Sequence, residues 1–309
     1  MIFSYLSICR FDHWIKNIFV LPGSILAIII FDLTISVDLF LNILICTLAA
    51  SFIASGNYAI NEWLDRHFDA LHPDKQDRPS VRGDITALGV AFVYTIMVLT
   101  GLTIGFFVNI YVFYALIAFV ISGLIYNVKP IRAKDLLYLD VIVESVNNPI
   151  RLFIGWFAVV DYALLPLSLV LFYWFLGAFM MNAKRLSEWK KFSSKSERLL
   201  YRPSLGTYDD QMLSVMCFVY AILSSSSLAL FAARYKFELI LWLPFFILIL
   251  AWYFKSALGN SGLTENPEKL MTSKRLLLLL AFNAIIFLFL LGANFEILDK
   301  VFYESLKFN

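Results

Sequence analysis

Nine long apolar runs constrain the fold of this chain more than any other feature of its 309 residues. A membrane-spanning helix needs about 20 mostly apolar residues, and each run is close to that length or longer. None of the runs alternates apolar and polar residues in the manner of an outer-membrane barrel strand. The pattern predicts an all-α fold, a polytopic membrane helical bundle of about nine transmembrane helices. The predicted spans are approximately 15–32, 38–60, 86–106, 109–127, 138–159, 163–182, 211–233, 237–254 and 275–295.

The composition excludes several other classes of protein. Hydrophobic residues make up 61% of the chain and charged residues 16%, whereas soluble domains have roughly 45–50% and about 25%. A formal net charge of +2 gives no general basic field for nucleic acid. Cys9, Cys46 and Cys217 lie far apart in the sequence, so they suit neither a disulfide framework nor a metal site. An ordinary soluble enzyme, a disordered chain and a nucleic-acid-binding module are therefore excluded.

The distribution of Lys and Arg predicts the orientation. With the N-terminus in the cytoplasm and the C-terminus outside (N-in/C-out), most of the 25 basic residues fall in cytoplasmic segments, as the positive-inside rule expects. The three long polar loops, 61–85, 183–210 and 255–274, then all lie on the cytoplasmic side. Soluble substrates should be met there.

The second run ends in a polar stripe formed by Asn57, Asn61, Asp65 and Asp69, which are spaced by four residues. This spacing places all four on one face of a helix. Carboxylate and amide oxygens suit Mg²⁺, and the basic residues that follow suit phosphate. The alternative interpretation is a solvated helix end, whose charged side chains only face the cytoplasm. The regular spacing, with HPxKxxRP behind it, favours the metal–phosphate interpretation.

The stripe also resembles the first Asp-rich motif of the UbiA-type membrane prenyltransferase superfamily. Its usual form is NDxxDxxxD, and Glu62 stands where the second residue is normally Asp. The resemblance implies nine helices with the N-terminus inside, and a diphosphate bound through Mg²⁺ at the cytoplasmic side. It also implies one UbiA-like transmembrane domain over residues 1–309, with active-site loops at about 61–85 and 183–210.

A second polar cluster lies inside the fifth run. Asp140, Glu144, Asn147 or Asn148, and Arg151 share one helix face by spacing. Charged groups inside a membrane span are costly and face a bundle interior or a wet cavity. Asp140, near the cytoplasmic end, favours a functional role. For Glu144 and Arg151, substrate contact and a mutual structural ion pair remain equally good interpretations.

The loop after the sixth run departs from the aromatic prenyltransferases of the superfamily, which carry a second DxxxD motif there. This chain has Asn182, Lys184, Arg185 and Glu188 instead. Cations at these positions would contact phosphate without an intervening metal. The change favours a substrate with several phosphates, or two phosphorylated substrates.

Four segments resemble decaprenyl-phosphate phosphoribosyltransferase and its relatives within this superfamily. They are RFDHWIKNIFVLPG, DALHPDKQDRPSVRG, YNVKP with LYLDVIVESVNNPIR, and KRLSEW with YRPSLGTY. The resemblance implies transfer of a 5-phosphoribosyl group from phosphoribosyl diphosphate to a polyprenyl phosphate, with Mg²⁺ as cofactor. Glu62 and the polar ESVNNP segment depart from that group's usual pattern.

The residues and the resemblance together define the expected site. Asp65, Asp69 and Asp140 are the predicted catalytic residues, and Asn61, Asp65 and Asp69 the predicted metal ligands. Lys16 could reach the lipid phosphate, although a lysine that only snorkels to the interface fits its position equally well. The predicted substrate-binding residues are Lys16, Asn57, Asn61, Lys75, Arg78, Tyr126, Lys129, Glu144, Arg151, Lys184, Arg185, Glu188 and Arg202.

Two other functions compete with this prediction. An aromatic-acceptor prenyltransferase would use the same metal site to ionise an isoprenyl diphosphate. A secondary transporter would account for charges in the membrane, but not for two phosphate-type loops. The expected location is the inner membrane of a bacterium, with the active site facing the cytoplasm.

Overall fold

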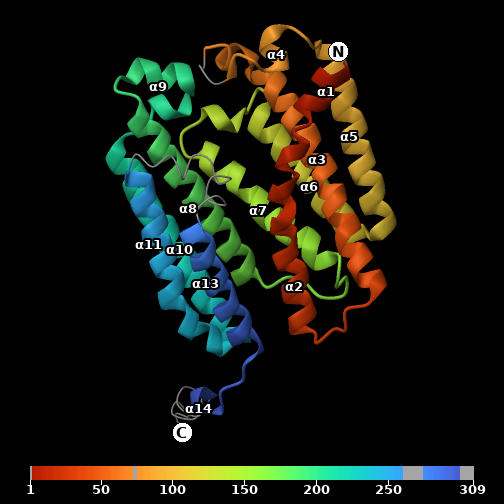
Figure 1. The fold of residues 1–309 in the computed structure, drawn as a ribbon, viewed down its shortest axis with the longest axis vertical. Helices are drawn as coiled ribbons and strands as arrows, with labels where there is room; N and C mark the ends of the chain where they lie inside the picture. Colours follow the sequence, from red (N-terminus) through yellow and green to blue (C-terminus); the bar gives the residue numbers. More distant parts are fainter. Residues whose placement is uncertain (1, 72–74, 260–273, 300–309) are drawn as a thin grey trace. The chain divides into compact units, whose positions relative to one another are not determined.

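The computed structural model describes residues 2–71, 75–259 and 274–299, and every secondary-structure element in these ranges is a helix (Figure 1). The chain groups into two compact units. Unit 1 comprises Met1–Leu165 and Phe192–Tyr208, and unit 2 comprises Pro166–Lys191 and Asp209–Asn309. The single-domain assignment of residues 1–309 stays a prediction.

Unit 1 contains most of the polar residues singled out in the sequence. Its helices are α1 (Ile2–Ile8), η1 (Phe11–Val20), α2 (Leu21–Ile30), α3 (Val37–Asp69), α4 (Pro79–Arg82), α5 (Ala87–Val108), α6 (Ile110–Asn127), η3 (Ala133–Asp135), α7 (Leu139–Phe157), α9 (Lys195–Tyr201) and η4 (Ser204–Gly206). Helix α3 packs against α5 and α6, and α7 packs against α2 and α6. Short polar side chains cap these helices. Ser36, Thr86 and Asn109 each accept a hydrogen bond from a backbone N–H in the first turn of α3, α5 and α6.

Unit 2 is a smaller helical group. It contains α8 (Leu167–Lys191), α10 (Asp210–Tyr235), η5 (Phe237–Trp242), α11 (Leu243–Leu258), α13 (Lys274–Gly292) and α14 (Glu296–Asp299). Helices α8 and α10 pack together, and α11 packs against both. Helix α8 continues to Lys191, whereas the sequence predicted a loop from residue 183. The polar residues 182–188 therefore lie on a helix.

The structure confirms the all-helical membrane architecture. A helix occupies each of the nine predicted runs. Seven segments of the described residues are long and apolar enough to cross a membrane: Ile2–Ile30, Val37–Asp69, Ala87–Val108, Ile110–Asn127, Leu167–Lys191, Asp210–Tyr235 and Phe237–Leu258. The other two runs are α7, which carries Asp140, Glu144 and Arg151, and α13, whose apolar part Leu277–Gly292 is shorter. The orientation stays a prediction, and residues 260–273 of the third polar loop lie outside the described residues.

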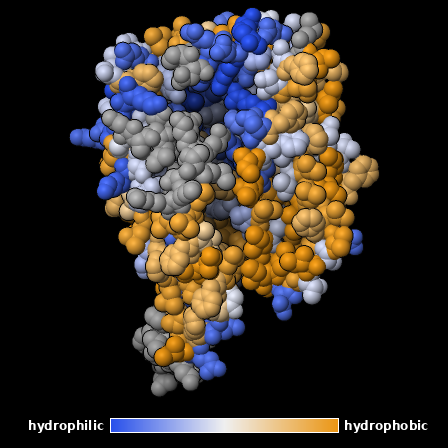
Figure 2. Space-filling view, viewed as in Figure 1, coloured by the Kyte–Doolittle hydropathy of each residue, from blue (hydrophilic) through white to orange (hydrophobic). Residues whose placement is uncertain are grey.

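The surface of unit 1 separates apolar from polar side chains. Figure 2 shows hydrophilic residues gathered at the end of unit 1 that holds α4, with hydrophobic residues over the length of the helices. Large apolar side chains such as Leu88, Phe92 and Phe107 are exposed. Contiguous exposed apolar surface of this kind is unusual in soluble proteins and suits contact with lipid.

Small residues bring α2 and α7 into close contact. A Cβ added at Gly155 would overlap the Val20 carbonyl oxygen, and one added at Gly23 would overlap the Leu152 carbonyl oxygen. The Ser24 hydroxyl donates to the Gly155 carbonyl at 2.8 Å. Backbone contact through small residues is a common way to pack helices in a membrane, because burial of apolar surface does not drive helices together in lipid. This contact holds α7, and therefore Asp140 and Arg151, in place.

We expect Gly155→Ala to destabilise the protein by about 3 kcal/mol, the upper end for overpacking, because the added methyl group meets backbone rather than a movable side chain. Thermal unfolding of the detergent-purified protein measures the effect. Gly292→Ala is the matched control, since its added Cβ meets nothing within 4 Å. Equal melting temperatures for the two variants would contradict the close α2–α7 contact.

Candidate active site

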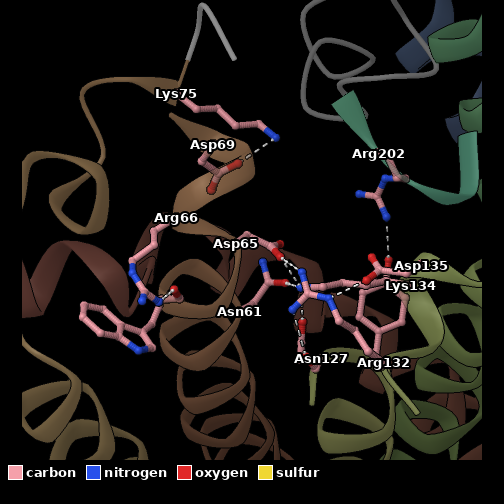
Figure 3. Close-up of polar contacts among 12 residues, drawn as sticks. Asn61, Asp65, Arg66, Asp69, Lys75, Asn127, Arg132, Lys134, Asp135 and Arg202 are labelled. Atoms are coloured by element: carbon pink, nitrogen blue, oxygen red, sulfur yellow. Dashed lines mark hydrogen bonds and ion pairs between the residues drawn. The ribbon is translucent and has the colours of Figure 1, made fainter. Parts of the chain in front are cut away.

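The polar stripe occupies the last three turns of α3, at the polar end of unit 1 (Figure 3). Asn61, Asp65 and Asp69 follow one another along the helix, as the spacing predicted. Asp69 is 4% exposed and Asp65 is 20% exposed. Arg66, the neighbour of Asp65 in sequence, points away from them and stacks on Trp63. The stripe thus presents oxygen atoms from one face of the helix.

Two cations from the segment between α6 and α7 bind Asp65. The Asp65 Oδ1 atom lies 2.7 Å from Arg132 Nη2 and 2.6 Å from Lys134 Nζ. Lys134 also donates to the side-chain oxygens of Asn61 and Asn127, at 2.9 Å each. Burial lowers the pKa of Lys134 to about 8, although Asp65 favours the charged form. Lys134 therefore still carries its charge at neutral pH.

Arg132 holds an unusual backbone conformation at the centre of this cluster. Its φ and ψ angles are 39° and 60°, in the left-handed region. Such a conformation costs roughly 1–3 kcal/mol for a residue other than glycine and needs support from its surroundings. The Arg132 side chain supplies that support by binding Asp65, Asp135 at 2.6 Å, and the Asn127 carbonyl at 3.3 Å. The contacts fix the guanidinium beside the stripe.

A second pair of cations binds Asp69. Lys75 Nζ lies 3.2 Å from Asp69 Oδ1, and Arg78 donates to Oδ2. Lys75 also lies over the Tyr201 ring at 5.4 Å. Burial lowers the pKa of Lys75, and Asp69 partly offsets this effect. Each of the two stripe carboxylates is thus contacted by two basic side chains.

Asp140 anchors the segment that carries Arg202. Asp140 is fully buried and accepts hydrogen bonds from Ser204 Oγ at 3.0 Å and Tyr208 Oη at 2.7 Å. Tyr208 Oη in turn accepts from the backbone N–H of Tyr138 at 2.8 Å. Arg202, at the start of this segment, donates to Tyr126 Oη at 3.3 Å. The arrangement suits Asp140 to positioning the segment, and its catalytic role stays a prediction.

We expect Tyr208→Phe to destabilise the protein by about 1.5–3 kcal/mol, because Asp140 loses a donor and the Tyr138 N–H loses its acceptor. Thermal unfolding measures the loss. Tyr235→Phe is the control, since the Tyr235 side chain is 52% exposed. A Tyr208→Phe variant as stable as the control would show that this anchor contributes nothing.

Other predicted residues of unit 1 lie away from these contacts. Asn57 donates to the Phe119 carbonyl at 3.2 Å and does not reach the cation cluster. Lys129 is exposed and makes no ion pair among the described residues. Lys16 is half-buried and lies 3.3 Å from His13 Nδ1. Glu144 and Arg151 form no ion pair in the described part of the chain, so the structural pair considered from the sequence does not form.

The predicted phosphate-binding residues of the sixth run belong to unit 2. Arg185 is 1% exposed and forms an ion pair with Glu188 at 2.6 Å on the same helix. Asn182 donates to the Leu213 carbonyl at 2.6 Å. Lys184 lies on the same turn of α8 as Arg185. The contacts of Arg185 and Asn182 pack unit 2, and a role in phosphate binding stays a prediction for Lys184, Arg185 and Glu188.

Sequence reasoning did not single out Arg132, Lys134 or Arg10. Arg132 and Lys134 stand 67 and 69 positions from Asp65 in the sequence. They contributed only to the count of basic residues that predicts the membrane orientation. Arg10 binds Glu62 at 3.0 Å, which explains how a Glu is accommodated at the usual Asp position. Arg10 lies in a segment that carries the family resemblance, whereas Arg132 and Lys134 lie between the two parts of another such segment.

The stripe suits a hard divalent cation that a bound substrate also coordinates. Asn61, Asp65 and Asp69 offer only oxygen donors, which Mg²⁺ prefers. Within the described ranges, no three His, Cys, Asp or Glu side chains form a metal cage. Mg²⁺ is usually held by one or two carboxylates together with substrate phosphates and water, so two carboxylates and an amide are sufficient. The surrounding cations suit those phosphates.

Comparison with known proteins identifies the family. The sequence model of the UbiA prenyltransferase family matches residues 19–280. The chain belongs to this family. It is therefore an integral membrane transferase, which removes the transporter alternative. A search of curated proteins found no match.

Solved structures share the fold. A UbiA homologue from Archaeoglobus fulgidus bound to DMAPP and Mg²⁺ has a TM-score of 0.69 at 17% identity, covering 92% of this chain and 99% of that chain. The same homologue bound to GPP and Mg²⁺ has a TM-score of 0.68 at 18% identity, with the same coverage of both chains. A structure of digeranylgeranylglyceryl phosphate synthase has a TM-score of 0.60 at 17% identity, covering 94% of this chain and 97% of that chain.

Proposed function

We propose that this transferase moves a 5-phosphoribosyl group from phosphoribosyl diphosphate to a polyprenyl phosphate, with Mg²⁺ as its cofactor. One observation carries the proposal. Each of the four segments that resemble decaprenyl-phosphate phosphoribosyltransferase contributes a residue that makes contacts within unit 1, although KRLSEW of the fourth segment lies in unit 2. Arg10 of the first reaches α3, Lys75 of the second binds the stripe, and Tyr208 of the fourth binds Asp140 of the third. Lipid-facing composition does not explain this convergence.

The charges of the site suit a donor with a diphosphate leaving group. Asn61, Asp65 and Asp69 would hold Mg²⁺, which would neutralise the negative charge that develops on the leaving diphosphate. Arg132 and Lys134 would bind phosphate oxygens directly, and Arg132 can do so with two parallel hydrogen bonds. Their ion pairs with Asp65 hold these cations beside the stripe before the donor binds. The lipid phosphate is anionic, so its attack needs no general base.

An aromatic-acceptor prenyltransferase is the competing proposal. The description of the family favours prenyl transfer, and two solved structures of a homologue hold DMAPP or GPP together with Mg²⁺. These structures are less than 20% identical to this chain and speak for the fold alone. An isoprenyl diphosphate would occupy the same stripe. The two proposals differ in which substrate carries the diphosphate.

We expect purified protein with Mg²⁺, radiolabelled phosphoribosyl diphosphate and a polyprenyl phosphate to give a labelled lipid. Asp65→Asn and Asp69→Asn should each lower kcat by roughly 10²–10³-fold, because each removes a carboxylate that would hold Mg²⁺ on the leaving diphosphate. Asp84→Asn is the control, since Asp84 pairs with Arg82 at the surface. Lipid extraction measures the product, and gel filtration shows that the variants remain folded.

Two results would contradict the proposal in different ways. Near-normal activity of Asp65→Asn or Asp69→Asn would refute the assignment of the stripe. Diphosphate release from an isoprenyl diphosphate with an aromatic acceptor, and none from phosphoribosyl diphosphate, would support the competing enzyme instead.

We also propose that the site faces the cytoplasm of a bacterial inner membrane. A cysteine at Lys195 should resist a membrane-impermeant maleimide in intact cells, and a cysteine at Arg234 should react. The background should be low because Cys9, Cys46 and Cys217 are all buried. The reverse labelling pattern would overturn the orientation.

A further inference from the structure

Arg151 is a buried cation that forms no ion pair with a carboxylate of the described residues. It lies on α7, is 9% exposed, and donates from Nε to Asn17 Oδ1 at 3.0 Å and from Nη1 to the Asn147 carbonyl at 3.3 Å. Its guanidinium also lies over the Phe119 ring at 4.8 Å. These partners are neutral. They orient the guanidinium without compensating its charge.

The other buried basic side chains behave differently. Of the four that are less than a tenth exposed in the described residues, Arg132 and Lys134 bind Asp65, and Arg185 binds Glu188. Arg151 is the exception. Removing an ion from water costs several kcal/mol unless a counter-charge compensates it, and a lone cation in a membrane protein indicates a functional site.

The partners of Arg151 are themselves held in place. Asn17 donates to Ser51 Oγ at 2.9 Å, and Asn147 Oδ1 accepts from Ser122 Oγ at 2.9 Å. The helices η1, α3, α6 and α7 thus meet around one guanidinium. Its Nη2 atom makes no hydrogen bond to the described residues and is not fully buried. Nη2 is therefore the donor left open to a ligand.

The guanidinium points toward the stripe end of α7. Its bond to the Asn147 carbonyl directs it back along the helix, and Asn147 lies seven residues, or about 10 Å, from Asp140. Phe119, which it covers, accepts a hydrogen bond from Asn57 of the stripe. Asn57 lies about 12 Å along α3 from Asp65. The open donor is thus a separate binding point, on the far side of the stripe from Asp69.

We propose that Arg151 anchors a second anion-binding site in unit 1 that takes a phosphate monoester. The inference rests on the proposed function, because both substrates of that reaction carry such a group. One is the 5-phosphate of the donor, and the other is the headgroup of the polyprenyl phosphate. A guanidinium binds phosphate oxygens in a fixed geometry that an ammonium does not reproduce.

Direct binding tests the site without turnover. The full-length protein in detergent is heated with ribose 5-phosphate or with farnesyl phosphate, and the shift in melting temperature is measured. We expect one of the two to stabilise the wild type but not Arg151→Gln, with a smaller shift for Arg151→Lys. Arg82→Gln, a surface variant, should respond like the wild type. The stabilising ligand identifies the source of the phosphate.

Steady-state kinetics provide the second readout. Arg151→Gln should raise the KM of the matching substrate roughly 10- to 100-fold, as loss of a charged hydrogen bond predicts, with a smaller effect on kcat. Asn17→Ala, which loosens the network but keeps the charge, should raise that KM less.

Three outcomes decide the matter. Failure of both ligands to stabilise the wild type would overturn the inference. So would a lower melting temperature of Arg151→Gln with unchanged KM values, because that result shows a purely structural role. Ligand stabilisation that requires Arg151, in a protein that makes no product from phosphoribosyl diphosphate, would support the site while refuting the proposed reaction.

Discussion

The ion pairs that Asp65 makes with Arg132 and Lys134 are the interaction on which the rest of the site depends. They join the end of α3 to the segment before α7, across 67 and 69 residues of sequence. Without them, the left-handed backbone at Arg132 would lose one of the three side-chain contacts that support it, and Lys134 would lose its carboxylate partner. The same contacts keep a cation-rich site assembled before any phosphate arrives.

This arrangement explains how one helical unit can serve a highly charged substrate. Before phosphate binds, Asp65 and Asp69 balance part of the charge of their four basic partners, and Asp135 also pairs with Arg132. The positive charge that remains suits a phosphate ligand. Phosphate oxygens can then take over those partners. Arg151 differs because only neutral groups hold it. Arg151 can therefore bind an anion without first breaking an ion pair with a carboxylate.

The sequence predicts much of the architecture, because hydropathy determines where helices form in a membrane. It also places Asn61, Asp65 and Asp69 on one face, because helical spacing is local. It does not predict that Arg132 and Lys134 bind Asp65 while nearby Lys129 stays exposed, because that choice depends on the turn before α7. Nor does it show that Asp140 bonds Ser204 and Tyr208 or that Arg185 pairs with Glu188. The Asp140 contacts follow from packing between distant segments, whereas Arg185 and Glu188 pair locally, three residues apart on α8.

The most direct test is a structure of the protein in lipid nanodiscs with Mg²⁺ and phosphoribosyl diphosphate. The account predicts the diphosphate beside Asp65 and Asp69, with Arg132 and Lys134 turned from Asp65 onto its phosphate oxygens. A diphosphate bound elsewhere, with both ion pairs to Asp65 intact, would contradict the central claim that the stripe and its basic partners form the donor site.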